Sequence, residues 1–311
     1  MTFLKVLEGL RTSFLDKLML GITYLGDEVA LFLFAAIILW CIDKRKGYRI
    51  CTACFSALAL TSLLKGLFMV ARPWVRDPSL TTVDGAAGTA EDFSFPSGHS
   101  ATAASAYGSI ARYFGDKAFK VLLLLLPLVV GFTRMYLGVH TPQDVAVGLI
   151  IGYGFAFGVP PLLEKLEARS VSSLKIDLFV TLCSAAIVIV LALRLRDPSL
   201  TEVQAACMKA CVKDGCTLLG AALGLTLGRW IEEKYIQFDP HGILPAQVIK
   251  VALGLALTMG IRVGLKALFN AVMPGSMVLQ VLRYFLLVMF LLCVWPLTFA
   301  HINKWFGKNR R

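Results

Sequence analysis

The stretch VLLLLLPLVVGFTRMYLGVHTPQDVAVGLIIGYGFAFG, residues 121–158, contains two long apolar runs separated by one short polar segment. Each run approaches the length of about 20 residues that crosses the hydrocarbon core of a bilayer as an α-helix. Thr141 can cap the second helix, and Pro142 fits its first position. The stretch therefore predicts two consecutive membrane-spanning helices joined by a turn.

The composition extends this prediction to the whole chain. Of its 311 residues, 57% are hydrophobic and only 16% are charged, whereas a soluble domain of this size needs more charge on its surface. We predict an all-α fold, a polytopic membrane helix bundle of about nine transmembrane helices. The predicted spans are 24–42, 48–71, 98–114, 118–138, 142–162, 176–194, 215–231, 246–269 and 278–300.

The first 23 residues differ from these spans. Their apolar residues recur at helical spacing, but charged residues such as Lys5, Arg11 and Lys17 interrupt them. A cleavable signal peptide needs an uninterrupted apolar region. Residues 1–23 are therefore predicted to form one amphipathic helix that lies on the membrane interface.

The net charge of +11 raises the question of a nucleic-acid partner, which we exclude because the basic residues fall in short loops between apolar runs. That distribution is typical of topology signals. Basic segments 43–49, 112–120, 164–175 and 303–311 fall on one side if the spans alternate. This side is predicted to be cytoplasmic, with the N-terminus outside and the C-terminus inside. The outer loop 194–214 also has four basic residues, so the bias is incomplete.

Two cations mark the end of the second span, in KGLFMVARP, residues 65–73. Lys65 and Arg72 are seven residues apart, so they share one face of a helix. A lysine inside an apolar span is costly and usually functional. Its stem can reach outward and bring the ammonium group toward Arg72.

The third span begins with FPSGHS, residues 95–100. Ser97 is a good N-cap, and Gly98 leaves the backbone open to close approach. The free N–H groups and the dipole of a helix N-terminus attract anions. His99 lies in this first turn, beside any anion that binds there.

The segment TRMYLGVHTPQD, residues 133–144, joins the fourth and fifth spans. Arg134 ends the fourth span. Thr141 and Asp144 have the spacing of a capping box, and His140 stands just before it. A carboxylate that bonds one imidazole nitrogen leaves the other nitrogen free to attack.

Three cations, a helix N-terminus and two histidines are what phosphoryl transfer requires. Fixed positive groups stabilise the developing charge, while one histidine attacks phosphorus and the other protonates the departing oxygen. A metal site formed by His99, His140 and Asp144 is the competing interpretation. We disfavour it because Lys65 and Arg72, together with Arg134, would repel a cation.

The segments KGLFMVARP, PSGH and RMYLGVHTPQD resemble the three signature motifs of the type 2 phosphatidic acid phosphatase (PAP2) family. Every spacing matches, and Thr133 stands where the family usually has serine. The resemblance implies that His140 is a nucleophile forming a phosphohistidine, that Asp144 orients it, and that His99 is the general acid. It also implies that no metal or other cofactor is needed. The phosphate would be held by Lys65, Arg72, Ser97, Gly98 and Arg134.

The leading functional prediction is a membrane phosphatase that hydrolyses lipid phosphate or diphosphate monoesters at the outer face of the plasma membrane. Its partners would be membrane lipid and the phosphorylated lipid substrate, with no nucleic acid. Three alternatives stay open: a lipid phosphotransferase of the same fold, a sugar-phosphate phosphatase, and a non-catalytic phospholipid-binding or transport protein. Binding alone needs cations but no nucleophile, which disfavours the last alternative.

The chain divides into the interfacial helix 1–23, a catalytic membrane core 24–169 and additional C-terminal helices 170–311. Three cations of the C-terminal part, Arg262, Lys266 and Arg283, are predicted at one depth of the membrane. They are candidates for binding a lipid headgroup, and ordinary snorkelling is the alternative.

Several other polar residues are given structural interpretations. Asp27 is expected to cap the first span, with a supporting role near the site as the alternative. Glu91 and Asp92 are expected to form a solvated loop edge, with screening of incoming anions as the alternative. A disulfide is considered among three cysteines that share one predicted loop, Cys207, Cys211 and Cys216.

Overall fold

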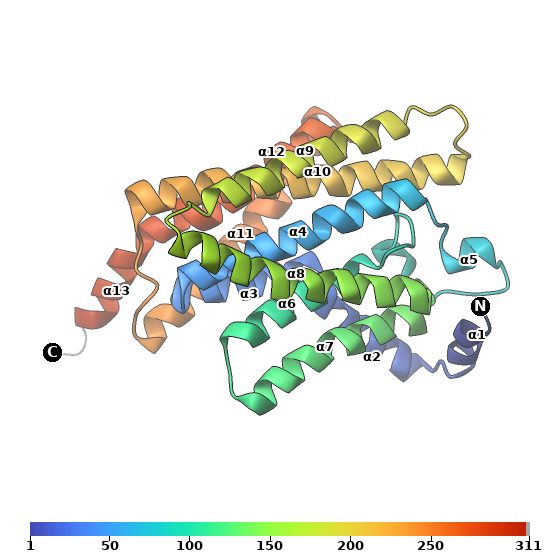
Figure 1. Cartoon of the computed structure of the whole chain (residues 1–311), viewed down its shortest axis with the longest axis horizontal. Helices are drawn as coiled ribbons and strands as arrows, with labels where there is room; N and C mark the ends of the chain where they lie inside the picture. Colours follow the sequence, from blue (N-terminus) through green and yellow to red (C-terminus); the bar gives the residue numbers. More distant parts are fainter. Residues whose placement is uncertain (309–311) are drawn as a thin grey trace.

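The computed structural model describes residues 1–308, and within this range the chain is built of helices and loops without a strand (Figure 1). The prediction of an all-α fold is confirmed. Residues 309–311, which end the predicted basic tail and the predicted C-terminal part, lie outside the described residues. The helices are α1 (Thr2–Gly9), α2 (Ser13–Thr23), α3 (Glu28–Cys41), α4 (Lys44–Phe68), α5 (Pro73–Arg76), α6 (Gly98–Tyr113), α7 (Lys117–Tyr136), α8 (Pro142–Ala168), α9 (Leu174–Arg194), α10 (Glu202–Ile231), α11 (Leu244–Val272), α12 (Met277–Met289) and α13 (Phe299–Lys308).

Seven helical stretches of the described residues are long and apolar enough to cross a membrane, so the chain is a multi-pass membrane protein. Each of the nine predicted spans falls on a helix, but two of them do not reach this length. The first falls on α3, which has 14 residues and, with the helical segment before it, forms a pair bent by 48°. The third falls on α6, which has 16 residues. The number nine stays a prediction.

The N-terminal segment forms two helices, so the prediction of one helix over residues 1–23 is wrong. The break lies at residues 10–12, where the Thr12 side chain accepts a hydrogen bond from Leu15 N and starts α2. Leu4 and Leu7 of α1 are buried together with Leu80. Both short helices pack against α7, so α1 and α2 belong to the folded body.

Helix α10 begins at Glu202, well before the predicted start of its span at residue 215. Thr201 and Gln204 form a capping box, which begins the helix before the apolar run does. The three cysteines of the predicted loop therefore lie on one helix. All eight cysteines fall within residues 1–308 and are free thiols, so the disulfide considered among these three is not formed.

Helix α4 connects the two parts of the bundle, because it packs against α6 and α8 as well as against α9 and α10 (Figure 1). Near its N-terminal end, Tyr48 lies under the guanidinium of Arg229 of α10, 4.8 Å from the ring centroid. Arg229 is buried and donates to Asp177 of α9 at 2.9 Å. This charged contact joins the C-terminal helices to the core at the end of α4 far from Lys65.

Helices α6 and α8 approach closely because small residues line their contact. A Cβ atom added at Gly148 would lie 2.5 Å from Ser97 O, and one at Gly152 would lie 2.5 Å from Ala101 O. Two glycines four residues apart allow membrane helices to pack at backbone distance. This contact brings the N-terminus of α6 to the first turns of α8, where two of the sequence motifs lie.

Candidate active site

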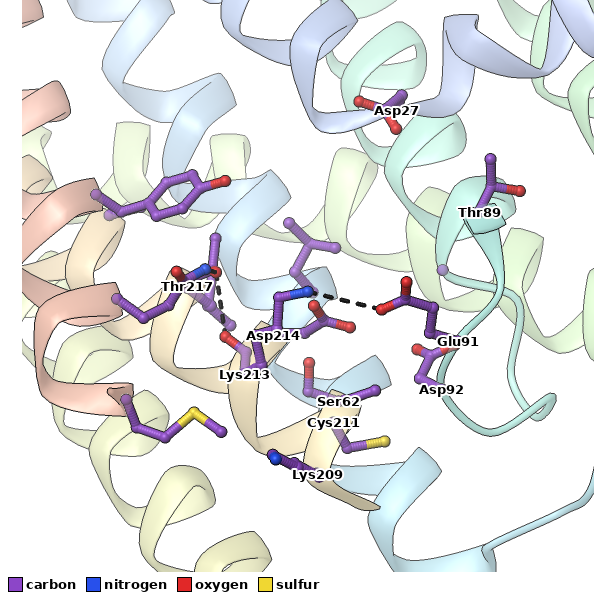
Figure 2. Close-up of a pocket in the computed structure, with 18 of the residues that line it drawn as sticks. Asp27, Ser62, Thr89, Glu91, Asp92, Lys209, Cys211, Lys213, Asp214 and Thr217 are labelled. Atoms are coloured by element: carbon purple, nitrogen blue, oxygen red, sulfur yellow. Dashed lines mark hydrogen bonds and ion pairs between the residues drawn. The ribbon is translucent and has the colours of Figure 1, made fainter. Parts of the chain in front are cut away.

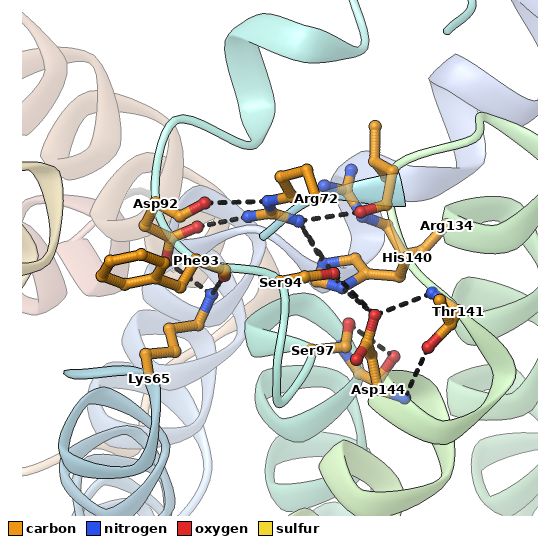
Figure 3. A network of polar contacts seen from close by, with 12 residues as sticks. Lys65, Arg72, Asp92, Phe93, Ser94, Ser97, Arg134, His140, Thr141 and Asp144 are labelled. Atoms are coloured by element: carbon orange, nitrogen blue, oxygen red, sulfur yellow. Dashed lines mark hydrogen bonds and ion pairs between the residues drawn. The ribbon is translucent and has the colours of Figure 1, made fainter. Parts of the chain in front are cut away.

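The three sequence motifs meet at one end of the bundle, as Figure 3 shows. The backbone N–H of Ser97 donates to Asp144 O at 2.9 Å, and Ser94 Oγ donates to the Asp144 carboxylate at 2.6 Å. These bonds tie the loop before α6 to the first turn of α8. Of the eight residues predicted for catalysis and phosphate binding, five line one cavity, namely Lys65, Arg72, Gly98, His99 and His140. The other three of these eight, Ser97, Arg134 and Asp144, are buried behind its wall.

His140 lies in the loop between α7 and α8 and is buried. Its Nε2 atom is 2.9 Å from Arg72 Nη1, and its Nδ1 atom is 3.5 Å from Asp144 Oδ2. A guanidinium group can only donate, so the Arg72 contact places the lone pair on Nε2 and the proton on Nδ1, facing Asp144. This is the tautomer that a nucleophilic Nε2 requires.

The surroundings of His140 fix the position of its partner Asp144 and the charge of its imidazole. Asp144 Oδ2 also accepts a hydrogen bond from Thr141 N at 2.7 Å, within the predicted capping box. Burial lowers the pKa of His140 well below its ordinary value of 6.5, and the charges of Arg72 and Arg134 lower it further. The imidazole is therefore neutral at pH 7, as a nucleophile must be.

His99 occupies the first turn of α6, which Ser97 caps by accepting a hydrogen bond from Ser100 N at 3.4 Å. The Nε2 atom of His99 is buried without a hydrogen-bond partner and lies 4.0 Å from Asp27 Oδ2. Asp27 caps α3 by accepting from Val29 N at 3.0 Å, so the predicted cap is confirmed. The second carboxylate oxygen of Asp27 faces His99, so Asp27 also lies at the edge of the site.

Arg134 is fully buried at the end of α7. It donates to Thr23 Oγ1 at 3.1 Å and to Thr89 Oγ1 at 2.9 Å, and its Nε atom is buried without a hydrogen-bond partner. These partners are neutral groups, although a buried charge is usually paired. Arg134 therefore contributes uncompensated positive charge next to the two histidines.

Asp92 belongs to the site, although it was not among the residues predicted for it. It was expected at a solvated loop edge, but its side chain is only 15% exposed and its Oδ2 lies 2.5 Å from Lys65 Nζ. Its Oδ1 pairs with Arg72 Nη2, and its carbonyl accepts from Arg72 Nε at 2.8 Å (Figure 3). Its neighbour Glu91 is exposed, as expected, and pairs with Lys213 at 3.6 Å.

The charge of Asp92 is set by these two cations. Burial would raise the pKa of its carboxyl, but Lys65 and Arg72 outweigh burial and hold the pKa well below the ordinary value of 3.8. The carboxylate thus occupies donors that the sequence assigned to phosphate. No local pattern around Asp92 indicates this contact, because the partners are 20 and 27 residues away in the chain.

The cavity has a volume of about 980 Å³ and is completed by helices α10, α11 and α12. Figure 2 shows Lys213 of α10 reaching toward Glu91, on the loop that also carries Asp92. The predicted headgroup cations Arg262, Lys266 and Arg283 line this same cavity. The structure therefore brings them together with His99 and His140, which sequence reasoning could place only at a similar depth.

The described residues contain no group of three or more His, Cys, Asp or Glu side chains that could hold a metal ion. The set of His99, His140 and Asp144, considered above as a competing metal site, does not form one. That the reaction needs no metal is a separate prediction.

Comparison with known proteins connects this geometry to a family. The sequence model of the PAP2 superfamily matches residues 46–167. A second model, the PAP2 superfamily phosphatase transmembrane extension, matches residues 216–306. The undecaprenyl-diphosphatase BcrC of Bacillus subtilis is 32% identical over 160 residues, which cover 49% of this chain and 79% of BcrC. The chain belongs to the PAP2 superfamily. The resemblance seen in the three motifs is thereby confirmed.

Other relatives match this PAP2 chain over shorter parts of their length. A probable sphingosine-1-phosphate phosphatase of Dictyostelium discoideum is 30% identical over 47% of this chain and 38% of its own. A lipid A 1-phosphatase of Rhizobium etli is 34% identical over 35% of this chain and 47% of its own. The chain thus spans less than half of these two relatives. The crystal structure of Aquifex aeolicus LpxE has 26% identity and a TM-score of 0.42, covering 50% of this chain and 91% of LpxE.

Proposed function

We propose that this PAP2 protein hydrolyses a lipid phosphate or diphosphate in two steps, through a phosphohistidine at His140. The observation that carries the proposal is the setting of His140. Its Nε2 lies 2.9 Å from Arg72 and its Nδ1 faces Asp144 at 3.5 Å. Both histidines line the cavity that also exposes Lys65. A positioned nucleophile, a second imidazole and fixed cations are the parts that phosphoryl transfer uses.

In the first step, Nε2 of His140 attacks phosphorus and the bond from phosphorus to the lipid oxygen breaks. His99 gives its proton to that oxygen, and the Asp27 carboxylate, 4.0 Å from Nε2 of His99, faces the imidazole that makes this transfer. In the second step, water attacks the phosphohistidine, its proton passes to His99, and the bond from phosphorus to nitrogen breaks. Inorganic phosphate is released and both histidines return to their starting state.

The charge that develops on the phosphoryl oxygens meets Lys65, Arg72 and Arg134. Guanidinium groups match phosphate oxygens in geometry and in charge, and the N-terminus of α6, which Ser97 caps, adds the N–H group of Gly98. These groups take the role that a divalent metal has in other phosphatases. We therefore propose that the reaction needs no metal.

The site is proposed to face the outside of the plasma membrane, with the N-terminus outside and the C-terminus in the cytoplasm. Figure 1 supports this orientation, because the junctions α3–α4, α6–α7 and α8–α9, together with α13, lie at the end of the bundle opposite α1. These junctions coincide with the basic segments identified in the sequence. Cytoplasmic loops carry an excess of Lys and Arg, so the site end is the outer end.

The relatives support lipid phosphates as the substrate class. Their names specify a sphingoid phosphate, a lipid A phosphate and a lipid diphosphate, which share a terminal phosphate on a lipid. Transfer of the phosphoryl group from His140 to an acceptor other than water is the second candidate. It uses the same first step, and only the acceptor in the second step differs.

Phosphate release by the purified protein in mixed micelles, with EDTA present, tests the proposal. The substrates are a panel of lipid phosphates, a lipid diphosphate and a sugar phosphate. We expect wild type to release phosphate and His140→Ala to lose the activity by several orders of magnitude. His241→Ala is the matched control, because His241 is exposed and pairs with Asp239, away from the cavity.

Two results would contradict this function. Full activity of His140→Ala would show that His140 is not the nucleophile. Loss of wild-type activity in EDTA would show that the reaction needs a metal. If folded wild type releases no phosphate, repeating the assay with acceptor lipids decides between the transferase and a protein that only binds phospholipid.

A further inference from the structure

The cavity has a second basic wall that the chemistry at His140 does not use. Helices α10, α11 and α12 contribute five cations to the lining, which are Lys209, Lys213, Arg262, Lys266 and Arg283. The same three helices contribute one acidic residue to it, Asp214. On the opposite wall Asp92 already pairs with Lys65 and Arg72. The wall formed by the C-terminal helices therefore carries the larger excess of positive charge.

Two of these cations converge on one tyrosine. Arg262 Nη2 lies 3.5 Å from the hydroxyl of Tyr284, and the guanidinium of Arg283 lies 4.8 Å from the ring centroid of the same residue. Tyr284 is only 3% exposed, so it fixes both contacts. Tyr284 therefore holds both cations on the same part of the cavity wall.

The position of Arg283 distinguishes this arrangement from ordinary snorkelling. Its Nε atom is buried and has no hydrogen-bond partner. A snorkelling arginine places its charged head in water and buries only its stem. Arg283 instead holds its guanidinium over the ring of Tyr284 in the wall of the cavity that it lines. Because Nε is closed to a ligand, an oxygen in the cavity would accept from the other guanidinium nitrogens.

We propose that this wall is a second anion subsite and that the substrate is a lipid carrying two phosphate groups. One phosphate is cleaved at His140, and the other is held by the C-terminal helices through Arg262, Lys266 and Arg283. The inference rests on the proposed function, because it names the substrate class of the same cavity. Two arginines with a lysine match a dianionic phosphate better than a single carboxylate.

The dimensions of the cavity agree with one ligand that touches both walls. Ligand pockets commonly have volumes of about 300–1,000 Å³, and this cavity of about 980 Å³ is at the upper end of that range. A single phosphate group would fill a small part of it. A headgroup with two phosphates would fill more of it, with one phosphate at each wall.

The test compares two lipids with the same chains, one with a single phosphate group and one with two. The measured quantity is the ratio of kcat/KM for the two-phosphate lipid to kcat/KM for the one-phosphate lipid, in mixed micelles. We expect wild type to favour the two-phosphate lipid. Arg283→Gln should lower the ratio about tenfold, because the loss of one hydrogen bond to a charged group has about this effect. Adding Lys266→Gln should lower the ratio further. Lys234→Gln is the matched control, since this exposed lysine follows α10 at the other end of the bundle.

Equal losses for both lipids, or an unchanged ratio in Arg283→Gln, would overturn the subsite while leaving the phosphatase intact. If no lipid is hydrolysed, the proposed function fails instead, and binding then decides the subsite. In that case the shift in thermal unfolding temperature caused by each lipid is measured with wild type and Arg283→Gln. A shift that is larger for the two-phosphate lipid, and lost in the variant, supports the subsite; equal shifts refute it.

Discussion

Replacing Asp92 with asparagine removes a negative charge from between Lys65 and Arg72, which are 5% and 3% exposed. Breaking a buried ion pair by removing one partner costs about 3–5 kcal/mol, because it leaves the other charge uncompensated. Two cations share this carboxylate, so we expect Asp92→Asn to lower the free energy of unfolding by about this amount. The protein should nevertheless gain affinity for anions at the same donors.

The gain in affinity gives the distinguishing measurement. In wild type, an incoming phosphate competes with the Asp92 carboxylate for Lys65 and Arg72, which weakens its apparent affinity. If Asp92→Asn lowers the phosphate dissociation constant about tenfold, from roughly 10 mM to roughly 1 mM, then 10 mM phosphate stabilises the variant by about 1.4 kcal/mol and wild type by about 0.4 kcal/mol. Thermal unfolding in detergent micelles, with and without inorganic phosphate, measures this difference.

The matched control is Asp84→Asn, which removes an exposed carboxylate from the same loop. It should behave like wild type in both buffers. Equal stabilisation of wild type and Asp92→Asn by phosphate would refute the reasoning. That result would mean that phosphate binds without displacing the carboxylate, and that Asp92 serves to position the two cations.

Three further predictions follow from the same geometry. Gly152→Leu should lower stability by about 1–3 kcal/mol and reduce phosphate release, because its Cβ would lie 2.5 Å from a backbone oxygen of α6, whereas Gly154→Leu, with nothing within 4 Å, should change neither. Asp27→Asn should slow the hydrolysis of a lipid phosphate more than that of nitrophenyl phosphate, whose leaving group departs without protonation; equal slowing would contradict a role through His99. Because the pKa of His140 is lowered in the folded state, its stabilising contribution is present above the unfolded pKa of about 6.5 and is lost on acidification. Between pH 7.5 and 5.5, His140→Asn should therefore lose about 1.4 kcal/mol less stability than wild type, and parallel unfolding curves would contradict this.

Much of the site could be predicted because its residues follow local rules. Ser97 and Thr141 begin helices as caps, and Asp144 completes a capping box. Each of these depends on residues within one turn of one another. The prediction that Lys65 and Arg72 share one face of a helix is wrong, because α4 ends at Phe68 and Arg72 lies beyond it, before α5. The two cations meet through Asp92 instead. The family motifs then supplied roles that spacing alone could not assign.

The parts that were missed depend on contacts between distant segments. Asp92 reads as a solvated loop residue until the fold brings it to Lys65 and Arg72. The buried pair of Arg229 and Asp177 joins residues 52 positions apart. Hydropathy also misplaced the start of α10, because its first turns are amphipathic rather than apolar and only the cap at Thr201 marks them.

The central claim, a phosphohistidine at His140, is tested most directly by trapping. Excess protein is mixed with a lipid phosphate carrying a labelled phosphoryl group, quenched in alkali at successive times, and the labelled peptide is mapped by mass spectrometry. The account predicts label on His140 that rises as substrate is consumed and decays as inorganic phosphate appears. Consumption of substrate with label on another residue, or with no protein-bound label at any time, would contradict it.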